Sequence, residues 1–118
     1  MIKSYQDIEV YQESYELTVM MHRKMNKIMD RKTYELTHQV KRASMSIPLN
    51  IAEGYGKRES TKEFKRFLRM SVGSVNEMEV LIELLKDLEH ISAQEYREML
   101  DRYKTVGKRI NAMIKSWV

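Results

Sequence analysis

The sequence predicts an all-α protein folded as an up-down-up-down antiparallel four-helix bundle. Three observations lead to this fold class. Apolar residues recur at intervals of three and four with almost no strict alternation, which is the helical period. Glycine occurs only four times and proline once, so few positions interrupt a helix. Two sequences, Ser60 to Glu63 and Ser92 to Glu95, have the Ser-x-x-Glu spacing of a capping box, which starts a helix.

Four helices are expected, and the short connections between them favour antiparallel neighbours. They cover about residues 7–29, 34–55, 60–90 and 93–117. The first has Asp7 and Glu9 in its opening turn, where negative charge is favourable. The third and fourth begin at the two capping boxes, and the second ends at the glycines of positions 54 and 56.

Pro48 lies inside the second predicted helix. Because proline has no N–H and crowds the preceding turn, a local bend is expected there. The carbonyl of Ser44 should then lack its usual donor. A hydroxyl of Ser44 or Ser46, or a water molecule, is expected to compensate.

Length and composition limit the class of protein. A chain of 118 residues with 42% hydrophobic and 32% charged residues fits a single folded domain. The absence of cysteine excludes a disulfide framework, thiolate catalysis and cysteine-ligated metal centres. The first dozen residues lack the apolar region of a secretory signal, and no stretch approaches the roughly 20 apolar residues of a membrane span. A cytoplasmic protein without membrane contact is therefore expected.

The first helix carries more apolar residues than one core needs. Ile8, Tyr11, Tyr15 and Val19 form a stripe that is expected to face the core. A second group lies roughly opposite at 100° per residue and would meet water without a partner: Val10, Leu17, Met21 and Ile28. These residues are predicted to form an oligomer interface. The alternative is a wide core-facing arc with a few exposed methionines, and the ten methionines of the chain fit either interpretation.

Four polar residues near the apolar stripes are assigned structural roles: Arg42, Asn50, Glu53 and Glu79. Glu79 falls on the apolar stripe of the third helix and needs a partner. A hairpin that turns near Arg58 places it beside Arg42 of the second helix. A partly buried Glu79–Arg42 ion pair that fixes the helix register is therefore expected.

Positive charge is concentrated in the middle of the chain. The net charge is +4, but residues 23–69 contain thirteen Lys and Arg against five Asp and Glu. The main cluster comprises Lys57, Arg58, Lys62, Lys65, Arg66 and Arg69, with Tyr55 as a nearby stacking surface. A second cluster, at the opposite end of an antiparallel bundle, comprises Arg23, Lys24, Lys27, Arg31 and Lys32. These patterns favour RNA or DNA binding through phosphates, and the alternative is a solvated basic face.

Neither a metal site nor a catalytic site is expected. Glu35-x-x-His38 resembles the metal-binding element of di-iron bundles, and His90 ends a similar sequence. Helical geometry, however, places both histidines opposite the apolar stripes, towards solvent. The Gly54-Tyr55-Gly56 sequence follows a helix rather than a strand, which indicates a helix stop and not a nucleotide site. No nucleophile, base and orienting group come together by spacing, so a non-enzymatic protein without cofactor is expected.

Two stretches resemble the signature of the 23S ribosomal RNA intervening-sequence protein family, which consists of small bacterial four-helix-bundle proteins. They are residues 42–58, RASMSIPLNIAEGYGKR, and residues 63–79, EFKRFLRMSVGSVNEME. The opening residues 7–11 are similar to the start of that family, with Tyr11 where tryptophan is common. Ser71 stands where alanine is usual. The resemblance extends over essentially the whole chain.

The resemblance implies a nucleic-acid-associated protein without a defining enzymatic activity. The family fold is also similar to the accessory protein of diversity-generating retroelements, a basic, barrel-like homopentamer that works with a reverse transcriptase. A homo-oligomeric ring, pentameric by this resemblance, is therefore expected to repeat the basic clusters. The main alternative is a protein-interaction module that docks a nucleic-acid-processing enzyme without itself binding nucleic acid.

Overall fold

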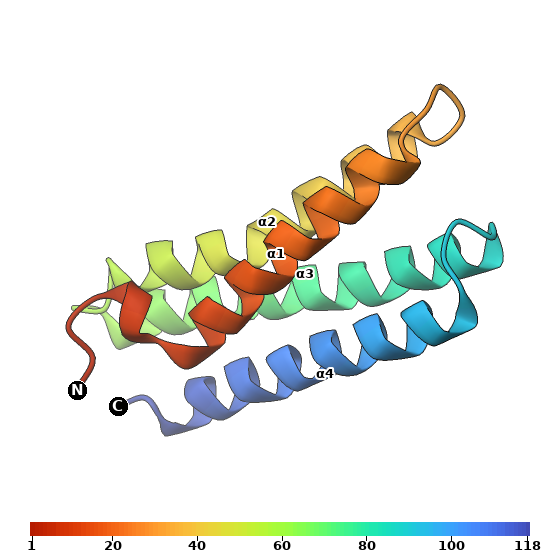
Figure 1. Cartoon of the computed structure of the whole chain (residues 1–118). Coiled ribbons are helices and arrows are strands. Elements are labelled where there is room, and N and C mark those ends of the chain that lie inside the picture. The colour runs from red at the N-terminus through yellow and green to blue at the C-terminus, as the bar shows by residue number, and fades with distance from the viewer.

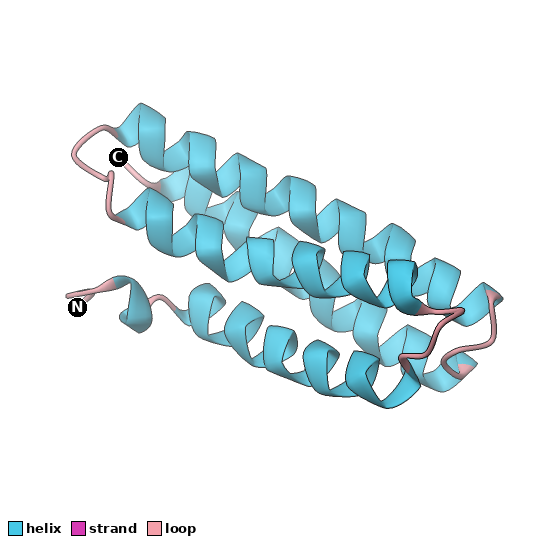
Figure 2. Cartoon of the chain, turned by 90° about the horizontal axis from the view of Figure 1, so that it is seen from above, coloured by secondary structure: helices cyan, strands magenta, loops and turns pink.

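The computed structural model describes all 118 residues and confirms an all-α bundle of four consecutively packed helices. A short 3-10 turn, η1 (Tyr5–Asp7), precedes α1 (Glu9–Ile28), α2 (Tyr34–Tyr55), α3 (Thr61–Asp87) and α4 (Ala93–Ser116). The helices form an elongated molecule of 45 × 23 × 21 Å, with both chain termini at one end (Figure 1). Every long element is a helix, and only short connections join them (Figure 2). No helix is sufficiently long and apolar to span a membrane.

The two predicted capping sequences both begin helices. At α4 the box is complete: Ser92 Oγ accepts from the Glu95 N–H at 3.0 Å, and Glu95 accepts from the Ser92 N–H at 3.0 Å. At α3, Ser60 Oγ accepts from the Glu63 N–H at 3.2 Å. The Glu63 carboxylate instead binds Arg66, so only half of that box forms.

The buried face of α1 is only partly the one predicted: Ile8 is buried and Tyr11 packs against the core as expected, but the core mainly takes the opposite side of the helix. Val10, Leu17 and Met21 are at most 3% exposed and lie in the core, whereas Tyr15 is 54% exposed. Ile28 is partly buried against the same core. The interface prediction for these residues is therefore wrong, because the bundle itself covers them. Apolar side chains surround α1 on several sides, so periodicity alone could not select the face that packs on α2.

The carbonyl freed by Pro48 finds its donor on another helix. The Thr18 hydroxyl of α1 lies 3.0 Å from the Ser44 carbonyl and 2.8 Å from the Ser14 carbonyl of its own helix, so these two acceptors share its one hydrogen. One residue before the proline, Ser71 of α3 donates to the Ile47 carbonyl at 2.9 Å. The free carbonyl was predicted, but compensation by Ser44 or Ser46 was wrong: the Ser44 hydroxyl donates instead to the Lys41 carbonyl at 3.0 Å.

The closing side of the bundle, between α1 and α4, differs from the other three. Helices α1 and α4 contact each other much less extensively than consecutive helices do. Three ion pairs cross this seam: Glu13–Arg109 at 2.9 Å, Glu16–Arg102 at 3.8 Å, and Lys24–Glu95. The α1–α2 and α3–α4 hairpins diverge towards the end that carries their connecting loops (Figure 1). Side chains along the seam therefore remain accessible.

Candidate nucleic-acid interface

The main basic cluster lies on the α2–α3 connection and the first turns of α3. Three of its members contact aromatic rings of the chain, and the Lys57 Nζ lies 5.7 Å from the centre of the Phe67 ring. The Arg58 guanidinium lies 4.2 Å from the centre of the Tyr55 ring and donates to the Tyr55 carbonyl at 3.0 Å. Arg66 lies 4.6 Å from the centre of the Phe67 ring and binds the Glu63 carboxylate, with the shortest N–O distance 2.9 Å. This hydrogen bond lowers the pKa of Glu63, so the carboxylate stays charged beside Arg66.

Tyr55 does not offer the stacking surface that was predicted. Its side chain is only 7% exposed. The ring packs edge-on against Phe64 and Trp117, at centroid distances of 6.1 and 6.4 Å, and Arg58 approaches its face. Because Trp117 returns to this end of the bundle at the end of α4, Tyr55 becomes part of the core. The prediction of a base-stacking role for Tyr55 is wrong.

Five of the six cations have no carboxylate partner, and three of these five also contact no aromatic ring: Lys62, Lys65 and Arg69. Helix α4 adds others beside them. Glu79 of α3 contacts Lys104 of α4 at 2.8 Å, which identifies the flanks on which these two helices face each other. At 100° per residue, Lys108 and Lys115 follow Lys104 along the same flank of α4. Since α3 and α4 are antiparallel, Lys115 lies beside the turn of α3 that contains Arg69, and Lys108 lies further along, beside the turn that contains Val75.

We call these five residues the basic band: Lys62, Lys65, Arg69, Lys108 and Lys115. None of them forms an ion pair. The α4 lysines were not predicted as part of the basic cluster, because they are far from residues 57–69 in the chain. Lys108 and Lys115 lie four and eleven residues after Lys104, and this helical spacing was a signal that they share one side of α4.

The second basic cluster is divided between a groove and a loop. Arg23, Lys24 and Lys27 line a groove between α1 and α4. Arg31 and Lys32 are exposed in the α1–α2 connection. The two clusters therefore lie at opposite ends of the bundle, as an antiparallel arrangement predicts.

The predicted Glu79–Arg42 ion pair does not form. Glu79 lies on the α4 side of α3, where its hydrogen bond with Lys104 raises the pKa of that lysine. Arg42 is exposed at a hollow between α2 and α3 that Glu77 also lines. The prediction that α2 and α3 form a hairpin is correct, but Glu79 lies on the side of α3 that faces α4 and not on the side that faces α2.

The other two polar residues have different positions. Asn50 donates its side-chain N–H to the Ser46 carbonyl at 2.8 Å and to the Ser46 hydroxyl at 3.0 Å. The Ser46 hydroxyl in turn lies 2.7 Å from that of Ser74, which links α2 to α3 beside the proline turn. Glu53 is exposed and forms no ion pair.

The histidines are separate from one another. His38 is exposed and stacks on Tyr34, with ring centroids 6.0 Å apart and planes inclined by 6°. His22 Nδ1 lies 2.9 Å from the Thr18 carbonyl. His90 is half-buried, less open to solvent than was predicted. No three His, Asp or Glu side chains come together as a metal-binding group.

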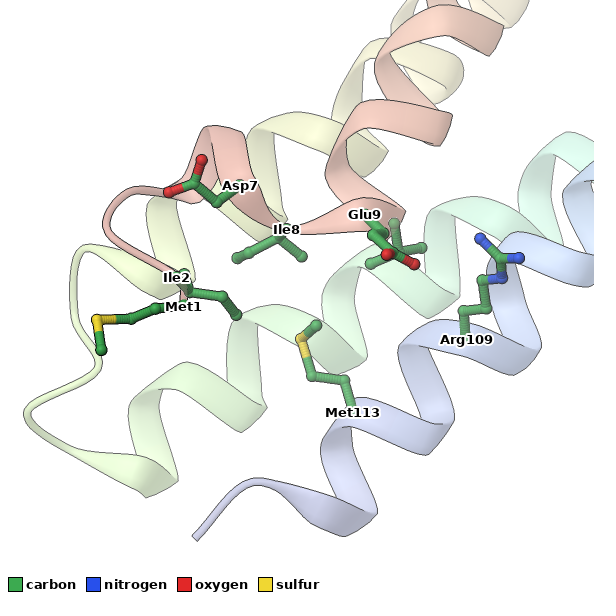
Figure 3. A pocket seen from close by; sticks show the side chains of 8 residues that line it. Met1, Ile2, Asp7, Ile8, Glu9, Arg109 and Met113 are labelled. Carbon is green, nitrogen blue, oxygen red and sulfur yellow. The ribbon is translucent and has the colours of Figure 1, made fainter.

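A hollow of about 440 Å³ lies between the N-terminal segment and α4 (Figure 3). Its walls are mainly apolar and include Ile2, Ile8 and Met113. Its one cation, Arg109, is paired with Glu13 at 2.9 Å. This hollow is therefore not a continuation of the basic surfaces.

An exposed apolar surface follows the outer side of the α2–α3 hairpin. Seven large apolar residues, each 42–58% exposed, belong to it: Tyr34, Met45, Leu49, Met70, Val80, Leu84 and Leu88. On each helix they lie away from the buried stripe, at helical spacing. We call this surface the outer apolar face. It is the uncovered apolar surface that the sequence analysis had assigned to α1.

Fold and surface together define a small helical-bundle protein with an unpaired basic band and an uncovered apolar face. Residues 6–112 match the 23S rRNA-intervening sequence protein family, and the chain belongs to this family. The resemblance noted in the sequence is thus confirmed.

The fold is similar to a crystal structure of a protein with unknown function from the S23 ribosomal protein family of Bacteroides thetaiotaomicron. That comparison has a TM-score of 0.80 at 24% sequence identity, covering 91% of this chain and 99% of the other. At this identity the match concerns the fold. No curated protein matches the sequence.

Proposed function

We propose that this protein is a non-enzymatic nucleic-acid-binding protein whose basic band contacts the phosphates of RNA or DNA. The observation that supports the proposal is the set of five cations without an ion-pair partner on the outward sides of α3 and α4. An ion pair within the protein would have to be broken before a phosphate could bind. The basic band carries no such cost.

The chemistry of the basic band favours phosphate contacts over base recognition. Four of its five members are lysines, which act as flexible point charges rather than as planar readers of base edges. Binding should therefore depend strongly on salt and weakly on sequence. The family's name refers to an intervening sequence of 23S rRNA, so a single-stranded RNA is the first ligand to test.

The test measures RNA affinity by fluorescence anisotropy at several salt concentrations. The slope of log K against log salt is negative, and each phosphate contact removed from a single strand makes it shallower by about 0.7. Combining Lys62→Gln, Lys65→Gln and Arg69→Gln should make the slope shallower by about 2. Arg31→Gln, an exposed cation in the α1–α2 connection at the opposite end of the bundle, is the matched control and should leave the slope unchanged. An unchanged slope in the triple variant contradicts the proposal and favours a protein-docking module.

We also propose that the protein forms a homo-oligomer, of the ring type implied by the resemblance, through the outer apolar face. The supporting observation is that seven large apolar side chains gather on one surface of the chain. A ring would place several copies of the basic band on one assembly, which strengthens binding to a long polyanion.

Light scattering tests this assembly. A mass of five chains is expected for the wild type, and Leu49→Glu with Val80→Glu should yield monomers because both charges would be buried in the interface. Met29→Glu is the control: Met29 is 41% exposed but lies outside the outer apolar face, so its mass should equal that of the wild type. A wild-type protein that is monomeric at all concentrations contradicts the assembly and leaves the basic band to act alone.

A further inference from the structure

A groove of about 570 Å³ follows the seam between α1 and α4. Helix α1 contributes Tyr15, Glu16, Arg23, Lys24 and Lys27 to its walls, and α4 contributes Arg102. The groove exists because α1 and α4 pack against each other less closely than the other neighbouring helices do. It is separate from the basic band, which lies on the α3–α4 side of the molecule.

The groove retains positive charge after its internal ion pairs are considered. Lys24 is engaged by Glu95 of α4. Arg102 lies 3.8 Å from Glu16, whose side chain is 75% exposed, so this contact is loose and open to competition. Arg23 and Lys27 form no ion pair. The groove therefore offers two free cations and a third, Arg102, that a stronger anion can take from Glu16.

The ring of Tyr15 forms an aromatic surface at one end of the groove. Tyr15 is 54% exposed. Its ring lies 6.0 Å from that of Tyr11, with the planes inclined by 35°, so α1 supports it from one side. Val19 and Met20 form an apolar surface between Tyr15 and the cations. The side chains thus change from aromatic to apolar to cationic along α1.

The dimensions match a short stretch of nucleic acid. Tyr15 and Lys27 are twelve residues apart on α1, or about 18 Å at the helical rise of 1.5 Å per residue. At about 3.4 Å per stacked nucleotide, this length accommodates roughly five nucleotides. Bases have flat apolar faces that stack on tyrosine, and their phosphates suit Arg and Lys.

We infer that the α1–α4 groove binds a single-stranded segment of nucleic acid, with a base stacked on Tyr15 and backbone phosphates at Arg23, Lys27 and Arg102. The inference rests on the proposed nucleic-acid binding and adds to it a second site and a strand preference. A base inside a duplex is stacked between its neighbours and does not present its face to Tyr15. The groove consequently selects single strands, whereas the basic band contacts phosphates of either form.

The stacking contact is tested with a six-nucleotide single strand that contains 2-aminopurine. Binding to the wild type should quench the 2-aminopurine fluorescence, since the base stacks on Tyr15. Tyr15→Ala should abolish the quenching and weaken binding about tenfold, while Tyr15→Phe should retain both. Met29→Ala is the control, because Met29 is 41% exposed but belongs neither to the groove nor to the outer apolar face.

The ionic contacts are tested with the same strand. Arg23→Gln combined with Lys27→Gln should make the salt slope shallower by about 1.4, for two phosphate contacts. Glu16→Gln should strengthen binding, because it removes the carboxylate that competes for Arg102. A blunt-ended duplex, which has no unpaired bases, should not compete with the single strand at the groove.

The outcomes separate this inference from the proposed function. The groove inference is overturned if Tyr15→Ala quenches the 2-aminopurine fluorescence and binds the single strand as the wild type does. It is also overturned if the duplex competes for the groove as well as a single strand does. If the basic-band variants still lose affinity in that case, the proposed function stands without the groove. Conversely, loss confined to the groove variants supports the inference and removes the basic band from the proposal.

Discussion

At Pro48, α2 lacks one N–H, and the Ser44 carbonyl instead lies 3.0 Å from the Thr18 hydroxyl of α1, whose one hydrogen it shares with the Ser14 carbonyl at 2.8 Å. Ser44 and Pro48 are both buried, so no bulk water replaces this donor. Thr18→Val should lower the free energy of unfolding by about 1–3 kcal/mol, because it leaves a buried carbonyl unpaired. Chemical denaturation measures the loss.

Two further variants identify the cause of that loss. Thr105→Val removes a hydroxyl that donates only to the Asp101 carbonyl of its own helix, at 3.0 Å, and should cost much less. In a Pro48→Ala background, the restored N–H of residue 48 can satisfy Ser44, so Thr18→Val should cost less than in the wild type. Equal costs in both backgrounds would show that the Thr18–Ser44 bond is not responsible.

The buried hydroxyl of Tyr103 has no hydrogen-bond partner. Burial raises the pKa of this phenol above its usual value of 10. Tyr103→Phe should therefore raise the free energy of unfolding by about 1 kcal/mol at neutral pH.

The same residue predicts a pH dependence. Above pH 10 the unfolded chain loses the Tyr103 proton while the folded chain retains it, so stability falls as the pH rises. The advantage of Tyr103→Phe over the wild type should consequently increase between pH 9 and pH 11, as measured by denaturation at each pH. A constant difference across this interval would contradict the burial argument.

Two glycines show how the packing of α2 on α3 limits sequence choice. A Cβ on Gly54 would lie 2.7 Å from the Phe67 Cβ and 3.1 Å from Phe64 Cδ1, whereas a Cβ on Gly73 would meet nothing within 4 Å. Gly54→Ala should destabilise the protein by about 1–3 kcal/mol through overpacking. Gly73→Ala, in an open helical position, should stabilise it by about 0.5–1 kcal/mol. Thermal unfolding of the pair checks both signs, and a stabilising Gly54→Ala would mean that the helices separate readily.

At the scale of helices, sequence patterns predicted the existence and ends of the elements but not all of their faces. The capping residues Ser60 and Ser92 marked helix starts because capping is local chemistry. The buried face of α1 could not be predicted, since Leu17 and Tyr15 are both apolar and only contact with α2 distinguishes them. For the same reason, the burial of Tyr55 depends on Trp117, which is more than sixty residues away in the chain.

The candidate site was predictable only in part, because its members come from distant segments. Lys62, Lys65 and Arg69 are close in sequence and share a flank of α3, so their spacing revealed them. Lys108 and Lys115 join them only when α4 folds back beside α3. The groove between α1 and α4 depends on how closely the first and last helices approach each other, which no local pattern encodes.

The contact between α1 and α4, which closes the bundle, is less extensive than the contacts between consecutive helices. The three ion pairs between α1 and α4 are partly exposed, and such pairs contribute little and are screened by salt. By contrast, α3 packs extensively against both α2 and α4. Opening of the α1–α4 seam should therefore require less free energy than unfolding of α3.

Native-state hydrogen exchange tests this difference between helices. Amide protons of Leu17 and Met21 in α1 should exchange faster than those of Val75 and Met78 in α3, although all four side chains are buried. Raising the salt concentration to about 0.5 M, where the screening length falls well below that at 0.1 M, should accelerate exchange in α1 and leave α3 unchanged. Equal protection in the two helices would mean that the seam opens only when the whole bundle unfolds. The groove would then have to accept a nucleic acid strand without any movement of α1.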